Sequence, residues 1–404
     1  MSSNTTHDPP LKVSIVGAGI GGLSAAIALR RSGHHVQIFE AADAIEEVGA
    51  AIVVPLNAQY VLKSFGYSRE NLNSVNFYGW RLGNLEGNTG KWSSRYLLVH
   101  RSDLHTELHR LATGPGEGPP ATIHVSSKVI ECDTEQSIIT LSDGRGISSD
   151  VIVGADGVAS FVRTSVLGHA VKSEPSGLTI YRGLIEMHKL EGRADVKWIQ
   201  EGISGARMII RRDGGGAWRM LFVYPCRGGT LLNVLQVVRS DHAYSTDWKG
   251  DEARANVLET FSDFHPMFQP VLEGLDERVM KWQLRKVPLL PTWVRGHAVL
   301  LGDAAHGTLP TMAQGSAMAI EDAGALGVLL CAGTRRSDVP ARLAGYESLR
   351  RERGNFVNQE SLDQAIVPEK FGEFFRCEEM QQRIIEFDAI KAAHEYFEQH
   401  FAVN

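Results

Sequence analysis

A glycine-rich turn near the start of the chain restricts the possible folds more than any other feature of the sequence. Gly17, Gly19 and Gly22 follow the pattern G-x-G-x-x-G, directly after the apolar run 13–16 and before a segment with helical spacing. A second apolar run, 36–39, comes next. Strand, helix and strand in this order form a βαβ unit, which requires parallel strands and a sheet covered by helices.

The same turn predicts a dinucleotide-binding site. Gly17 permits the tight turn, Gly19 lets a pyrophosphate approach the backbone at the helix N-terminus, and Gly22 lets the helix pack closely on the strand. Glu40 closes the second strand, where a carboxylate would bind ribose hydroxyls. The alternative is a merely tight turn between strand and helix, and the motif alone does not distinguish FAD from NAD.

Composition and charge exclude several classes of protein. The chain has 404 residues, 43% of them hydrophobic and 22% charged, as expected for a globular protein. A formal net charge of −6 argues against a nucleic-acid-binding surface. The four cysteines lie far apart without a C-x-x-C pair, so we expect neither a metal site nor disulfides. The first ten residues are polar and no long apolar run is uninterrupted, which predicts a cytoplasmic protein without stable membrane insertion.

Two later strand ends carry a carboxylate. One apolar run leads into Asp303, and Gly315 and Ser316 open the helix that follows. An acid at the carboxyl end of a strand lies in the crevice where open α/β sheets bind ligands, and a helix start offers N–H groups to a flavin ring. Another apolar run leads into Asp156. Either string alone is compatible with a structural turn, but together, behind the glycine motif, they favour a flavin.

In order and spacing, these three motifs resemble those of the single-component FAD-dependent aromatic hydroxylases, the class A flavoprotein monooxygenases. The resemblance covers nearly the whole chain and is nearest to salicylate-hydroxylase-like and fungal members. It implies FAD as cofactor and NADH or NADPH as a co-substrate without a domain of its own. It also implies reaction with O₂ through C4a-hydroperoxyflavin and hydroxylation of a small aromatic substrate, a phenol or hydroxy-aromatic acid.

The resemblance further implies roles for single residues. Arg101 would contact the phosphate or ribityl oxygens of FAD, and Ala51 would line the flavin. Asp303 and Ser316 would hold the ribityl and isoalloxazine ends. Asp156 would bridge the pyrophosphate region and the approach of the nicotinamide.

One position departs from the family's pattern. Gly307 stands after His306, where many relatives have proline, and we expect it to loosen the loop beside the flavin. For His306 itself, a structural place in this loop competes with a role in proton handling.

Arg182 and Tyr224 are the candidate catalytic residues. The resemblance places Arg182 near flavin and substrate, where it would pair with a substrate carboxylate or phenolate or stabilise the flavin peroxide. On an alternating strand Tyr181 and Arg182 face opposite sides, so that one reaches the pocket while the other packs outside. The alternatives are a solvated strand arginine in an ion pair and, for Tyr224, a core tyrosine.

These observations predict an α/β fold with a Rossmann-like FAD-binding domain, an inserted, mainly antiparallel β substrate domain and C-terminal helices. We place the first part of the FAD-binding domain at 1–172, the substrate-binding domain at 173–286, the second part at 287–345 and the helical segment at 346–404. A monomer or a homodimer is expected.

Three other activities fit parts of the sequence. The same flavin chemistry epoxidises alkenes or oxidises alicyclic and alkaloid rings, and its mark would be turnover without a phenolic group. A non-catalytic flavin-binding protein would hold FAD without substrate-stimulated NAD(P)H oxidation. A nicotinamide-only dehydrogenase leaves the two later motifs unexplained. The sequence leaves the substrate, the regiochemistry and the choice between NADH and NADPH open.

Overall fold

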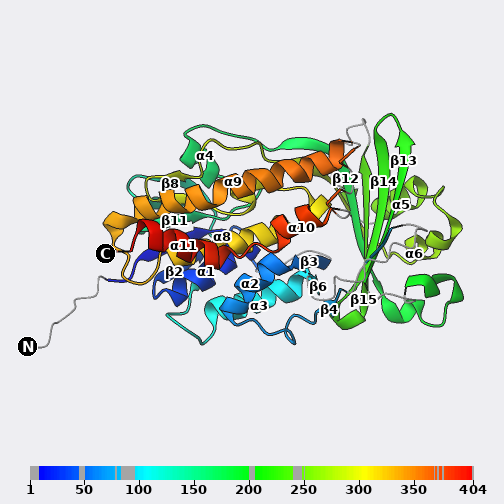
Figure 1. Ribbon diagram of the computed structural model, residues 1–404, viewed down its shortest axis with the longest axis horizontal. Coiled ribbons are helices and arrows are strands. Elements are labelled where there is room, and N and C mark those ends of the chain that lie inside the picture. Colours follow the sequence, from blue (N-terminus) through cyan, green and yellow to red (C-terminus); the bar gives the residue numbers. More distant parts are fainter. Residues whose placement is uncertain are drawn as a thin grey trace, which may run out of the picture.

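Two large sheets organise the protein, as seen in a computed structural model of the chain (Figure 1). The structure describes residues 9–44, 51–77, 80–82, 96–199, 205–239, 248–249, 251–367, 369–370, 373–374 and 377–402. The seven-stranded sheet stands at one end of the long axis, and the parallel sheet with its helices occupies the other.

The parallel sheet has six strands in the order β18-β19-β11-β1-β2-β7. All of its pairings are parallel except that of β18 with β19. Its members are β1 (Lys12–Val16), β2 (His35–Phe39), β7 (Thr122–His124), β11 (Val151–Gly154), β18 (Val294–Arg295) and β19 (Ala298–Leu300). The predicted βαβ unit is confirmed, since β1 pairs with β2 in parallel and helix α1 (Ile20–Arg31) connects them.

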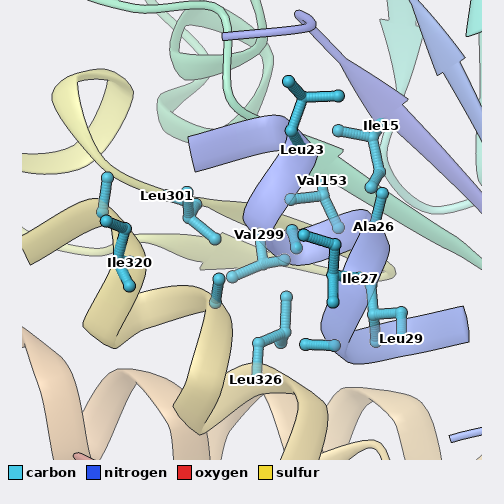
Figure 2. Close-up of a cluster of buried hydrophobic side chains, with 14 of the residues drawn as sticks. Ile15, Leu23, Ala26, Ile27, Leu29, Val153, Val299, Leu301, Ile320 and Leu326 are labelled. Atoms are coloured by element: carbon cyan, nitrogen blue, oxygen red, sulfur yellow. The ribbon is translucent and has the colours of Figure 1, made fainter. Parts of the chain in front are cut away.

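Helices α1 and α8 (Gly315–Leu329) pack together against this sheet. Ala28 and Gly327 face each other so closely that a Cβ on Gly327 would lie 2.6 Å from that of Ala28. Figure 2 shows the resulting core, in which Leu23 and Ile27 of α1 meet Val153 and Val299 of the strands. Full burial of one such aliphatic side chain contributes about 1.5–3 kcal/mol to the free energy of unfolding.

The second large sheet is mainly antiparallel, with the order β16-β17-β12-β15-β14-β13-β5. Its strands are β5 (Trp80–Leu82), β12 (Glu174–Glu186), β13 (Ala206–Gly214), β14 (Ala217–Cys226), β15 (Leu231–Arg239), β16 (Trp248–Lys249) and β17 (Met280–Lys286). Strand β5 comes from outside the range 173–286 and pairs with β13 in parallel. Helices α5 (Asp251–Thr260) and α6 (Gln269–Glu273) lie beside this sheet (Figure 1).

Smaller elements complete the fold. One three-stranded sheet contains β3 (Ala51–Pro55), β4 (Val75–Asn76) and β6 (Tyr96–His100), and another contains β8 (Val129–Asp133), β9 (Ile138–Leu141) and β10 (Gly146–Ser148). The remaining helices are α2 (Leu56–Phe65), α3 (Arg101–Thr113), α4 (Val162–Leu167), α7 (Asp303–His306), α9 (Val339–Ile366), α10 (Glu378–Ile385) and α11 (Ala389–His400). Short 3₁₀ turns cover Met187–Leu190, Ala194–Ile199, Arg227–Gly229, Pro266–Phe268, Pro310–Met312 and Arg336–Asp338.

Helix α9 connects the two ends of the molecule (Figure 1). Near its start, the Tyr346 hydroxyl donates to the Leu300 carbonyl of β19 at 3.2 Å. Near its end, the Ala365 carbonyl accepts from the indole N–H of Trp218 on β14 at 3.0 Å. One helix therefore fixes the parallel sheet relative to the seven-stranded sheet, and the predicted α/β architecture with C-terminal helices is confirmed. Among the helices that the structure describes, none is both long and apolar enough to cross a membrane.

Candidate active site

A cavity of about 360 Å³ extends from the glycine turn to the inner face of the seven-stranded sheet. Eight of the predicted site residues line it: Gly19, Ala51, Arg101, Arg182, Tyr224, Asp303, Gly315 and Ser316. The other four, Gly17, Gly22, Glu40 and Asp156, are not among its lining residues. The structure therefore brings together side chains and turns that are far apart in sequence.

The glycine turn shapes one end of this cavity. Gly17 has φ +101°, and a Cβ there would lie 2.6 Å from the Ala155 carbonyl oxygen; a Cβ on Gly22 would lie 2.0 Å from the oxygen of Gly17. Both positions therefore exclude a side chain because of the protein's own backbone. At Gly19, by contrast, a Cβ meets nothing within 4 Å. Gly19 is the N-cap of α1 without a side-chain cap, so the helix start can take an anion such as a pyrophosphate.

Two side chains bond the backbone of Ala18 in the middle of the turn, one at its N–H and one at its carbonyl. The Glu40 carboxylate accepts from the Ala18 N–H at 2.7 Å, and Nε2 of His105 lies 2.8 Å from the Ala18 carbonyl oxygen. Glu40 also accepts from the Ala42 N–H at 2.9 Å. Glu40 stands at the end of β2 as the sequence predicted, and there it braces the backbone of the turn.

Asp303 and the start of α8 form a second edge of the cavity. Asp303 begins α7 directly after Gly302, whose φ of 62° and ψ of −137° favour glycine. Burial raises the pKa of Asp303, while the nearby charges of His306 and Arg101 oppose this shift. Gly315 and Ser316 open α8 with no side-chain cap from Gln314. Both residues line the cavity, so the start of this helix lies at its edge.

Asp156 uses its carboxylate at the start of α4. It accepts from the backbone N–H groups of Phe161 at 2.7 Å and Val162 at 3.1 Å, and from the Ser160 hydroxyl at 2.5 Å. Burial raises the pKa of Asp156, and these hydrogen bonds counteract the shift. Here the carboxylate organises the turn after β11.

The loop around Gly307 is packed, contrary to the expectation that glycine loosens it. A Cβ on Gly307 would lie 2.9 Å from Cγ2 of Val287. The Asn358 amide donates to the Gly307 carbonyl at 3.3 Å and to that of Val287 at 3.2 Å. The Asn358 side chain of α9 therefore fixes this loop through two hydrogen bonds.

Arg182 projects into the cavity from β12, and the predicted alternation is confirmed. The Tyr181 ring is buried in the core on the opposite face of the sheet. Nε of Arg182 is buried without a hydrogen-bond partner, and the guanidinium lies 5.6 Å from the centroid of the Trp282 ring. Burial lowers the pKa of Arg182, with a further lowering by Arg101 and an opposing effect of Tyr224. Among the ion pairs of the described residues, none involves Arg182.

The wall around Arg182 is apolar and aromatic. Trp218, Met220, Phe222 and Tyr224 alternate along β14 and line the cavity together. Burial raises the pKa of Tyr224 well above its ordinary value, although the charge of Arg182 opposes the shift. Of this strand only Tyr224 was predicted as a site residue, although the two-residue period from 218 to 224 is visible in the sequence and also indicates Trp218, Met220 and Phe222.

A buried charge network behind the second edge was also missed. The Asp322 carboxylate lies 2.6 Å from Nε2 of His306, which gives His306 a structural place in the loop. Arg350 forms ion pairs with both Glu321 and Asp322, and all three side chains are fully buried. Neighbouring acids at 321 and 322 next to the Ser316 helix start were the only signal in the sequence.

Known proteins are similar to this chain both in sequence and in fold. A family profile described as "FAD binding domain" matches residues 123–361, and one described as "NAD(P)-binding Rossmann-like domain" matches 15–63. Hispidin-3-hydroxylase of Neonothopanus nambi is 40% identical over 397 residues, which is 94% of each chain. The FAD-dependent monooxygenase cfoG of Aspergillus candidus is 33% identical over 92% of this chain and 90% of its own.

A more distant relative and two solved structures are also similar to this chain over most of its length. The 6-hydroxynicotinate 3-monooxygenase of Bordetella bronchiseptica is 28% identical over 87% of this chain and 91% of its own. The solved structure of CtdE with FAD and a substrate has a TM-score of 0.78 at 22% identity, covering 96% of this chain and 98% of its own. A salicylate hydroxylase substrate complex has a TM-score of 0.74 at 23% identity, covering 97% and 99%.

The cavity fits the cofactor of these proteins. The open position at Gly19 and the uncapped starts of α1 and α8 offer space and N–H donors, and Arg101 adds a cation to the lining. Such groups suit the pyrophosphate and the polar ring edge of FAD. The profile that matches more than half of the chain and the relatives aligned along nearly all of it lead to the same assignment: the chain belongs to the FAD-dependent monooxygenases.

Proposed function

We propose that this monooxygenase hydroxylates a phenolic or hydroxy-aromatic substrate, consuming NAD(P)H and O₂. One observation carries the proposal: a half-buried arginine, Arg182, whose Nε is fully buried, faces an apolar and aromatic cavity without a carboxylate partner among the described residues. A partly desolvated cation in such a place calls for an anionic or strongly polar oxygen on the ligand. The names of two relatives point the same way, hispidin-3-hydroxylase and 6-hydroxynicotinate 3-monooxygenase.

The proposed roles divide the cavity into two halves. In the cofactor half, Gly19 and the α1 start would take the pyrophosphate, Arg101 and Asp303 would bind phosphate or ribityl oxygens, and Ser316 would meet the ring. FAD, when bound, supplies the activation of O₂ and the transfer of one oxygen atom. Gly17, Gly22, Glu40 and Asp156 support this half by shaping its turns, Ala51 and Gly315 line it, and a contact of Asp156 with the nicotinamide remains a prediction.

In the substrate half, Arg182 and Tyr224 would bind the ring oxygen. A phenol that binds as its phenolate gains charge-assisted hydrogen bonds from the guanidinium, and the ring is more electron-rich as an anion. Since burial raises the pKa of Tyr224, its hydroxyl stays protonated near neutral pH and can donate to the same oxygen. The apolar wall formed by Trp218, Met220 and Phe222 would exclude water and orient the ring.

The domain boundaries belong to this proposal. We assign 1–172 and 287–345 to the cofactor domain, 173–286 to the substrate domain and 346–404 to the helical segment, with β5 as a strand that the cofactor domain contributes to the second sheet. The cytoplasmic location and the monomeric or homodimeric state stay predictions from the sequence.

The test is NAD(P)H oxidation by FAD-loaded protein with a panel of phenols and hydroxy-aromatic acids, salicylate included. Mass spectrometry follows the product, and a peroxide assay runs in parallel. We expect at least one compound to stimulate oxidation and to gain one oxygen atom. Stimulation with peroxide as the only product would mean that the ring binds without being the true substrate. If no phenol stimulates oxidation and a non-phenolic alkene or alkaloid does, the proposed substrate class is wrong.

A further inference from the structure

A buried pair of neighbouring carboxylates stands behind the cofactor half of the cavity. Glu321 and Asp322 lie on α8, and both side chains are fully shielded from solvent. Neither residue lines the cavity itself. Their hydrogen bonds, however, lead to both edges at which the chain would contact FAD.

Asp322 holds the first of these edges. Its Oδ2 accepts from the Gly302 N–H at 3.0 Å and lies 2.6 Å from Nε2 of His306. These two contacts enclose Asp303, the carboxylate that lines the cavity. Gly302 has a backbone conformation that glycine adopts readily and other residues do not, and Asp322 is the side chain that accepts from its N–H. The direction of Asp303 therefore depends on Asp322.

Glu321 is linked to the second edge, the start of α8, through the uncharged side chain of Asn57. Its Oε1 accepts from Nδ2 of Asn57 at 2.5 Å, and the same amide nitrogen donates to Oε1 of Gln314 at 3.0 Å. Gln314 is the N-cap of α8 and directly precedes Gly315 and Ser316. The position of this helix start therefore depends on Glu321 and Asn57.

Two arginines of α9 join the halves of the network. Arg350 lies 2.8 Å from Asp322 and 2.7 Å from Glu321, and Arg353 lies 2.7 Å from Glu321. The two positive charges balance the two negative ones, which is the condition under which buried ionised groups remain stable. A single rigid unit thus reaches both edges of the cavity.

We propose that Asp322 and Glu321 are positioning residues that set the geometry of the two cofactor-contacting edges, Asp322 at the Gly302 turn and Glu321, through Asn57, at the start of α8, and thereby the affinity and electronic state of bound FAD. The inference requires only that FAD occupies this cavity, and it is independent of which substrate is hydroxylated. A failure of the phenol panel would leave it standing.

The test compares Asp322→Asn and Asn57→Leu with the unchanged protein. FAD is titrated into each apoprotein at a temperature at which near-UV circular dichroism shows all variants folded. The absorption spectrum and the midpoint potential of the bound flavin are then recorded. We expect FAD to bind about 10- to 100-fold more weakly to Asp322→Asn, because the amide has one acceptor oxygen in place of two, so that either the Gly302 N–H or the Arg350 guanidinium loses its partner. We expect shifted flavin bands in both variants, with a smaller effect for Asn57→Leu, which changes no charge.

The matched control is Glu347→Gln on α9. Glu347 also accepts from a backbone N–H, that of Trp293 at 2.8 Å, but neither residue lines the cavity. Its loss should lower the melting temperature of the apoprotein and leave FAD affinity and spectrum unchanged. The proposal is overturned if Asp322→Asn and Asn57→Leu behave like this control, with lower melting temperatures but wild-type FAD affinity, spectrum and potential. Should Asp322→Asn not fold, Asn57→Leu alone decides.

Discussion

Arg182 on β12 and Tyr224 on β14 face the same cavity from two strands that β15 separates. Their charges influence each other: the pKa of Tyr224 is raised by burial and lowered in part by the Arg182 guanidinium. Two polar groups thus converge from different strands on a wall that is otherwise apolar. A substrate oxygen placed between them would receive a charged and a neutral hydrogen bond. The aromatic ring that carries this oxygen would lie against the apolar wall, away from water.

Replacement of Arg182 tests its contact with the substrate. We expect Arg182→Gln to retain FAD but to lower kcat/KM for the phenolic substrate about 10- to 100-fold, because a hydrogen bond to a charged group is lost. Steady-state kinetics with the substrate found in the phenol panel measure this, and the flavin absorbance of the purified variant reports FAD content.

The control for Arg182 lies on the other face of the same sheet. Arg211 on β13 forms exposed ion pairs with Asp213 and Asp263 at 3.2 and 3.0 Å. Such surface pairs contribute little to stability, so Arg211→Gln should show wild-type kinetics. If Arg182→Gln hydroxylates as fast as Arg211→Gln, Arg182 is not a catalytic residue.

Two glycines of the turn, Gly19 and Gly22, should respond differently to alanine. Gly22→Ala would place a methyl group 2.0 Å from the Gly17 carbonyl oxygen, so we expect a lower melting temperature of the apoprotein and loss of FAD together. Gly19→Ala has open space around its Cβ. It should keep the melting temperature of the apoprotein and weaken FAD binding about tenfold or more, since the methyl group would occupy the approach to the α1 N-terminus.

Melting curves without FAD and titrations with FAD separate the two effects. Gly33→Ala is a useful reference, because Gly33 has φ +87° and open space but lies outside the cavity lining. It should cost stability through backbone strain alone. Wild-type FAD affinity in Gly19→Ala would show that the cofactor does not approach the turn.

Much of the fold was predictable because its signals are local. The strand, glycine turn and helix at residues 12–31 follow from the apolar runs and from the glycines, because the backbone path of this turn leaves no room for a side chain at Gly17 or Gly22. The later turns at Asp156 and Asp303 carry the same signal of an acid at a strand end. In both cases the residues that create the pattern are neighbours in sequence.

The remaining parts depend on contacts between distant segments. The sequence around residue 80 carries no pattern that predicts the pairing of β5 with a sheet whose other strands begin at residue 174. The link between Asp322 and Gly302 spans 20 residues, and that between Asn57 and Glu321 spans 264. Glu40 shows a further limit: its place was predictable, whereas its bond to the Ala18 N–H depends on how the turn folds back.

The raised pKa of Tyr224 predicts the pH dependence of turnover. Burial favours the neutral phenol, so Tyr224 should remain a donor throughout the range from pH 7 to 10. Tyr224→Phe should therefore lower kcat/KM by about fivefold to tenfold, the cost of one neutral hydrogen bond, without removing the basic limb of the pH profile. A basic limb that disappears in Tyr224→Phe would mean that this hydroxyl ionises during turnover.

Acid unfolding should reveal the charge of Asp322. Burial disfavours its ionised form, but the nearby charges of His306 and Arg350 outweigh burial and lower the pKa of Asp322 from 3.8 to about 2. In the unfolded chain this carboxylate takes up a proton near pH 4, whereas in the folded protein it does so only near pH 2. The stabilisation is thus fully present above pH 4 and is lost as the pH falls toward 2.

The difference in the free energy of unfolding between the unchanged protein and Asp322→Asn should therefore shrink by about 2 kcal/mol when the pH falls from 6 to 2. All other carboxylates are common to both proteins, so their titration largely cancels in this difference. Urea unfolding of the two apoproteins in steps of one pH unit measures it. A difference that stays constant across this range would show that Asp322 titrates alike in the folded and unfolded chains, and that the ion pair with Arg350 adds no net stability.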